Sequence, residues 1–148
     1  MPLSTPFVLL RIPQVLFNEM IEQARAELPN ECCGLLAGRI TGGVGVVTHR
    51  YPLVNAAADP RLFESEPRSM LAATKDMNRH ETDVLAVYHS HPTSEPVPSR
   101  TDLERNYSEG VVNLIISLAG EEPAVRGWWL TAADYREAAW ECQGEERS

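Results

Sequence analysis

The sequence is poor in cysteine and in long apolar runs, and each shortage excludes a class of protein. Its 148 residues include three cysteines, of which Cys32 and Cys33 are adjacent, so a disulfide framework is not expected. No apolar run approaches the roughly 18 residues that a membrane-spanning helix needs. The first residues carry no basic stretch ahead of their apolar segment and no small-residue cleavage site, so we expect no signal peptide and a cytoplasmic protein.

Basic residues are also too few for a nucleic-acid-binding protein. Lys and Arg number 13 against 21 Asp and Glu, which gives a net charge of −8. Nucleic-acid binders need a basic stripe, and an anionic membrane surface repels an acidic protein. We therefore expect neither nucleic acid nor membrane as a partner, and the sequence leaves the oligomeric state open.

The sequence has the composition of a globular protein, and segments with strand patterns are interspersed with segments with helix patterns. Residues 1–148 fit a single domain, with a polar and frayed tail from about Gln143. The periodicities predict strands at residues 7–12, 32–40, 44–54, 83–91, 111–118 and 124–131, and helices at about 13–28, 67–81 and 99–108. This order predicts an α/β (α+β) fold with a single mixed β-sheet flanked by helices.

Two of the four histidines stand one residue apart at the end of the most apolar predicted strand, "DVLAVYHSH" (Asp83–His91). His89 and His91 share one face of that strand, because successive side chains alternate between faces. Two imidazoles on one face can chelate one ion. A strand histidine is more often only hydrogen-bonded, so the pair alone does not establish a metal site.

Asp102, eleven residues after His91, supplies a third donor. Catalytic zinc sites keep three protein ligands and leave the fourth position to water. "SRTD" (Ser99–Asp102) equally fits a helix start in which the serine hydroxyl caps a backbone N–H. The two roles can coexist, because a capped turn would hold both side chains toward the histidines. Three prolines in residues 92–98 stiffen the intervening loop.

The segment "HSHPTSEPVPSRTD" (residues 89–102) resembles the signature of the JAMM (MPN+, Mov34/PAD-1-like) zinc metallopeptidases. "PNECCGLLAGR" (Pro29–Arg39) is similar to the glutamate-bearing segment that precedes that signature in the family. The resemblance implies a cytidine-deaminase-like JAMM/MPN architecture.

The resemblance also implies roles for five residues. His89, His91 and Asp102 would bind one Zn²⁺ ion. Glu31 would be the general base that takes a proton from zinc-bound water and delivers it to the leaving amine. Ser99 would donate a hydrogen bond to the oxyanion of the tetrahedral intermediate.

Other residues near the motif receive structural interpretations. Without the resemblance, Glu31 would be read as an exposed residue before a strand. Cys32 and Cys33 are expected in the core, because three ligands are already found. His49 and His80 are expected to be structural or exposed.

The compact length suggests which members of the family the chain resembles. Only eight residues separate Asp102 from the next predicted strand at Val111, so we expect the second of the insertions that eukaryotic members often carry to be absent. The chain is similar to the free-standing prokaryotic members, which are associated with ubiquitin-like or sulfur-carrier proteins that end in Gly-Gly. The resemblance therefore implies a zinc peptidase or isopeptidase that cleaves after such a tail.

Two other functions are alternatives to this one. A non-catalytic MPN-type scaffold or protein-interaction domain would keep the fold and lose ligands, and the intact set of five residues argues against it. A zinc deaminase needs a C-x-x-C motif, which this sequence does not contain.

Overall fold

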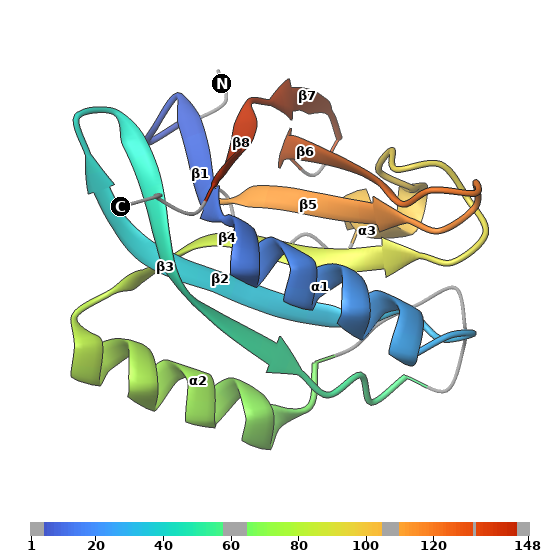
Figure 1. The fold of residues 1–148 in the computed structure, drawn as a ribbon, viewed down its shortest axis with the longest axis horizontal. Helices are drawn as coiled ribbons and strands as arrows, with labels where there is room; N and C mark the ends of the chain where they lie inside the picture. The colour runs from blue at the N-terminus through green and yellow to red at the C-terminus, as the bar shows by residue number, and fades with distance from the viewer. Residues whose placement is uncertain (1–4, 58–64, 105–109, 132, 145–148) are drawn as a thin grey trace.

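A computed structural model describes residues 5–57, 65–104, 110–131 and 133–144 of the chain. Within these ranges the chain forms one mixed eight-stranded sheet with helices on both faces (Figure 1). The strands are β1 (Leu9–Pro13), β2 (Cys33–Thr41), β3 (Val44–Leu53), β4 (Asp83–His91), β5 (Val112–Ser117), β6 (Ala124–Leu130), β7 (Tyr135–Ala138) and β8 (Trp140–Gln143). The helices are α1 (Gln14–Ala26), α2 (Pro67–His80) and α3 (Arg100–Glu104). The predicted fold class is confirmed.

The sheet curls until its two ends meet. Its strand order is β7-β6-β5-β4-β2-β3-β1-β8, and only Ala139 separates the two terminal strands in the sequence. The N–H of Leu10 donates to the Ala139 carbonyl at 3.0 Å. The rings of Phe7 and Trp129, from opposite ends of the order, lie 5.1 Å apart between centroids. The curled sheet therefore encloses most of the hydrophobic core.

The sequence did not predict β7 and β8. Both strands have four residues. Strand β7 is mostly exposed and shows no alternation, and the alternation of Trp140–Gln143 in β8 is at the lower limit of length for recognising a strand. Backbone pairing to β6 and β1 holds them instead. Gln143, near which the polar tail is predicted to begin, is the last residue of β8, and residues 145–148 lie outside the described residues.

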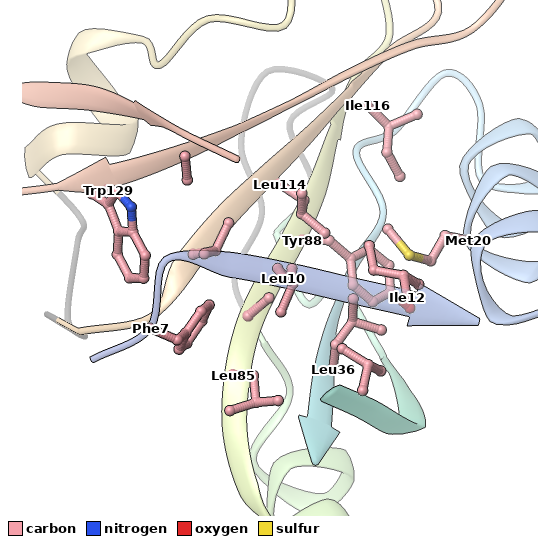
Figure 2. Close-up of a cluster of buried hydrophobic side chains, with 14 of the residues drawn as sticks. Phe7, Leu10, Ile12, Met20, Leu36, Leu85, Tyr88, Leu114, Ile116 and Trp129 are labelled. Carbon is pink, nitrogen blue, oxygen red and sulfur yellow. The ribbon is translucent and has the colours of Figure 1, made fainter. Parts of the chain in front are cut away.

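Helix α1 covers the concave face of the sheet. It begins directly after Pro13, whose fixed φ suits a helix start, and it ends at Ala26. Its buried Met20 lies among Ile12, Leu36 and Tyr88, and Figure 2 shows these side chains converging from α1 and the neighbouring strands. This cluster is the main core of the protein.

The opposite face is covered in two separate parts. Ala73 and Met77 of α2 pack on β2 and β3, and Leu103 of α3 packs on β5 and β6 with the loop residue Val97. Strand β4 lies between β2 and β5, so its C-terminal end falls between these two covers. The predicted helix over residues 99–108 is described only as far as Glu104. None of the described helices is long and apolar enough to span a membrane.

Candidate active site

His89 and His91 occupy the C-terminal end of β4 in the middle of the sheet. Strand β4 pairs with β2 on one side and with β5 on the other, which explains its continuous apolar run. The two histidines lie on the same face, as the alternation predicts, and are only 2% and 4% exposed. Both imidazoles are therefore shielded from bulk water and held by a rigid element.

Asp102 reaches the histidines from the first turn of α3. Its Oδ1 lies 3.1 Å from His89 Nε2, and its Oδ2 lies 3.1 Å from His91 Nε2. The Ser99 hydroxyl accepts a hydrogen bond from the Asp102 N–H at 3.1 Å, and the Ser99 N–H donates to Asp102 Oδ2 at 2.8 Å. This reciprocal pair is a helix capping box, which holds the aspartate toward the histidines.

The three side chains have the geometry of a metal-binding site. The Nε2 atoms of His89 and His91 lie 3.2 Å apart. Ligands about 2.0–2.1 Å from a tetrahedral zinc ion lie about 3.3–3.4 Å from one another, close to the separations found here. His91 Nδ1 lies 2.8 Å from the Glu95 carbonyl, so we assign the ring proton to Nδ1. That tautomer leaves the Nε2 lone pair directed at the other two donors.

The electrostatics of the cluster also favour a bound cation. Burial raises the pKa of Asp102, but hydrogen bonds to His89 and His91 outweigh it and hold that pKa well below its usual range. Burial lowers the pKa of His91, but hydrogen bonds to Asp102 and to the Glu95 carbonyl raise it further than burial lowers it. The ionised aspartate thus requires a positive partner, which is either a proton or a metal ion.

Glu31 is buried beside the cluster, contrary to the reading from the residue alone. It is 5% exposed and comes two residues before Cys33, which pairs with His89 across the sheet. Alternation along this segment places Glu31 on the face that carries the histidines. The negative charge of Glu31 contributes to the raised pKa of His91, so the carboxylate lies within electrostatic reach of that imidazole.

Hydrogen bonds fix the segment that carries Glu31. The Cys32 N–H donates to Ser90 Oγ at 2.8 Å, and the Ser90 N–H donates to the Cys32 carbonyl at 3.2 Å. Asn55 Nδ2 donates to the Glu31 carbonyl at 2.7 Å. Ser90, the residue between the two histidines, therefore joins the glutamate segment to the strand that carries the other donors.

The loop between β4 and α3 is fixed at three consecutive carbonyls. His91 Nδ1 binds the Glu95 carbonyl, as described above, and Ser117 Oγ donates to the Ser94 carbonyl at 2.6 Å. Trp128 Nε1 donates to the Pro96 carbonyl at 2.9 Å. The sequence gives no signal for Ser117 and Trp128, because their role depends on the register of β5 and β6, which no local motif encodes.

Cys32 and Cys33 are core residues, as predicted. Both are buried, and burial raises the pKa of each thiol to about 12. Since the thiolate is the metal-binding form of cysteine, these two residues are poor ligands at neutral pH.

Comparison with known proteins agrees with this arrangement. Residues 13–131 match the family described as prokaryotic homologs of the JAB domain. The chain belongs to this family. The resemblance to the prokaryotic JAMM/MPN proteins is thereby confirmed.

Two curated relatives and one solved structure extend the comparison. The desampylase of Haloferax volcanii is 38% identical over 117 residues, which are 78% of this chain and 81% of that protein. The CysO-cysteine peptidase of Mycobacterium tuberculosis is 33% identical over 101 residues, or 68% of this chain and 67% of that protein. The solution structure of protein DSY2949 from Desulfitobacterium hafniense is 34% identical, with a TM-score of 0.83 over 92% of this chain and 94% of that one.

Proposed function

We propose that this protein is a zinc-dependent isopeptidase or peptidase that cleaves the amide bond after the Gly-Gly tail of a ubiquitin-like or sulfur-carrier protein. The observation that carries the proposal is the convergence of His89, His91 and Asp102 beside the buried Glu31. The names of the relatives support it, since two are a desampylase and a CysO-cysteine peptidase. A single domain in the cytoplasm stays a prediction.

His89, His91 and Asp102 would hold the ion. Zinc bound in this way acidifies water and polarises a carbonyl, which is the chemistry that amide hydrolysis requires. Three protein ligands would leave room at the ion for the reacting groups. Because the three residues are buried, a cation held by them would act at low effective dielectric, where electrostatic interactions are stronger than in water.

Glu31 would act as the general base and then as the general acid. Its buried carboxylate lies on the face of the sheet that carries the histidines, where it can take a proton from the attacking water. The same carboxyl group can then deliver that proton to the departing amine, so the proton is conserved over the step. A positioned acid–base group of this kind contributes roughly 10²–10⁴-fold.

Ser99 would stabilise the oxyanion. Its Oγ accepts the hydrogen bond from the Asp102 N–H, so the hydroxyl proton is available for a second bond. The capping role and the catalytic role therefore use different parts of one hydroxyl group.

The burial of the site favours a substrate with a slender end. The donor side chains are less than a tenth exposed, so a tail with bulky side chains would need the surrounding loops to open. A Gly-Gly tail has no side chains and can extend to a buried centre.

The test measures cleavage of a ubiquitin-like carrier joined through its Gly-Gly tail to a second protein. Wild type should cleave it, and Glu31→Gln should be slower by about 10²–10⁴-fold while retaining its zinc. Glu104→Gln, which changes an exposed carboxylate of α3, is the matched control and should cleave normally. If the zinc-loaded wild type cleaves neither this fusion nor its isopeptide-linked counterpart, the proposed activity is wrong and the non-catalytic scaffold becomes the better interpretation.

A further inference from the structure

A second cluster of metal-binding side chains lies away from the candidate active site. It consists of His49 on β3 with Asp76 and His80 on α2, and their donor atoms all lie within 4.8 Å of one another. Asp76 and His80 are one helical turn apart, with 3.6 Å between Oδ1 and Nε2. The ring of His49 lies 4.5 Å from that of His80 between centroids. A helix and a strand thus present three donors to one point.

Neighbouring hydroxyl groups orient two of the three donors. The Tyr51 hydroxyl donates to Asp76 Oδ2 at 2.6 Å, which leaves Oδ1 toward His80. Thr48 Oγ1 lies 2.8 Å from His49 Nδ1, which leaves the Nε2 of that ring for a ligand bond. Hydrogen bonds of this kind to the outer atoms of ligands are what holds ligands in place in metal sites.

The helix end that carries His80 is anchored to the sheet. Arg39 of β2 donates to the His80 carbonyl at 2.8 Å and to the Glu81 carbonyl at 3.3 Å. Glu81 adopts a left-handed conformation, and the following N–H of Thr82 returns to the Met77 carbonyl at 3.0 Å. The backbone of the third donor is therefore fixed although its side chain is exposed.

The guanidinium group of Arg79 lies near the carboxylate of Asp76 and would compete with a metal ion for it. Arg79 Nη1 lies 3.9 Å from Asp76 Oδ1, and the Arg79 side chain is 73% exposed. Exposed ion pairs at this distance contribute little, so the arginine can be displaced. The 3.6 Å between Asp76 Oδ1 and His80 Nε2 also slightly exceeds the separation of ligands around a zinc ion, and rotation of the half-exposed His80 ring can shorten it.

We propose that His49, Asp76 and His80 form a second binding site, for a divalent transition-metal ion of the zinc, nickel or copper type. Two imidazoles and one carboxylate suit these ions better than magnesium or calcium, which prefer oxygen donors. Water would complete the coordination at this exposed position. His49 pairs with Ala37, four residues along β2 from the Cys33 that pairs with His89, so the two sites bind independently. An ion here would tie the last turn of α2 to β3.

The experiment titrates the metal-free protein with Zn²⁺ in a chelator-buffered solution and counts the ions bound. Wild type should bind about two, while His80→Ala and His91→Ala should each bind about one and the double variant none. Asn78→Ala, an exposed change in the same turn of α2, is the matched control and should bind two. His80→Ala changes the second site and His91→Ala the first. The experiment therefore distinguishes a second site that binds no ion from a first site that binds none.

A second measurement keeps the proposal testable if the zinc affinities overlap. Zn²⁺ should raise the melting temperature of the His91→Ala protein by mass action, and His80→Ala in that background should abolish the rise. Asp76→Asn should weaken the rise, because the neutral amide is a poorer ligand. The proposal is wrong if His80→Ala binds as many ions as wild type, whatever that number is.

Discussion

The two His-His-Asp clusters contain the same three donors in opposite surroundings. His89, His91 and Asp102 lie at the centre of the sheet, where each side chain is less than a tenth exposed. In the second cluster, the side chains of Asp76 and His80 are 32% and 46% exposed. The first cluster combines a central strand with the capped start of a helix, and the second combines a strand with the last turn of a helix.

The difference shows that donor identity alone does not provide catalysis. The first cluster has the buried carboxylate of Glu31 beside it, which can move a proton, and its burial strengthens every electrostatic interaction. Among the described residues, the second cluster has hydrogen bonds and ion pairs with Thr48, Tyr51 and Arg79, none of which is a carboxylate. We therefore propose hydrolysis at the first site and binding alone at the second.

The sharpest test of this comparison is the same substitution in both clusters. Asp102→Asn should lower zinc affinity at the first site by more than about 100-fold, because it replaces the charged ligand that we propose with a neutral amide, and contacts that only support a ligand are already worth 10–100-fold. Cleavage should be lost with the metal. Asp76→Asn should weaken only the second ion and leave cleavage unchanged. Zinc content and initial rates, measured on both variants, would contradict the comparison if Asp76→Asn reduced cleavage as far as Asp102→Asn.

A smaller loss is expected from the residue that caps α3. Ser99→Ala removes the hydroxyl that we assign to the oxyanion, so kcat should fall by about 10²–10³-fold. Loss of the cap should also cost about 1 kcal/mol of unfolding free energy. Ser99→Thr keeps a hydroxyl and should recover much of the rate. A variant that loses stability but no kcat would reduce Ser99 to its capping role.

The local motif predicted the first cluster, but the sequence could not predict the second. His89, His91 and Asp102 belong to one short segment whose strand alternation and capping pattern are both local. His49 and Asp76 come together only through the packing of α2 on β3, and that contact follows from the register and the core cluster. His80 was therefore predicted to be structural or exposed, and the exposure is correct while its partners could not be foreseen.

The same distinction holds for the supports of the first cluster. The sequence predicted the strand at residues 83–91 and the turn before α3, since each has a periodic or capping signature. It did not predict the short strands β7 and β8, nor Trp128 as a support of the loop, because these depend on pairings between distant segments.

Trp128 and its neighbour Trp129 allow a controlled test of how the loop between β4 and α3 is supported. Trp128→Phe removes the hydrogen bond to the Pro96 carbonyl, so the loop that holds His91 should loosen and zinc affinity should fall by about 10-fold. Trp129→Phe changes the other face of β6, where Trp129 packs against Phe7. It should lower the unfolding free energy without altering zinc affinity. Zinc affinity is measured for both variants by chelator-buffered titration, and stability by urea unfolding. If the two variants bind zinc equally well, Trp128 does not help to position the site.

The smallest effect is expected from Cys33, which pairs with His89 yet is not one of the donors. Burial raises the pKa of its thiol to about 12, so at neutral pH it stays protonated and does not compete for the ion. Cys33→Ala should leave zinc content and cleavage unchanged. Raising the pH through about 9, where the thiol of the unfolded chain ionises, should destabilise wild type progressively up to about 12, and Cys33→Ala should reduce that loss. A drop in zinc content in Cys33→Ala would instead make the thiol a fourth ligand, and the first cluster would then lack the open position that hydrolysis requires.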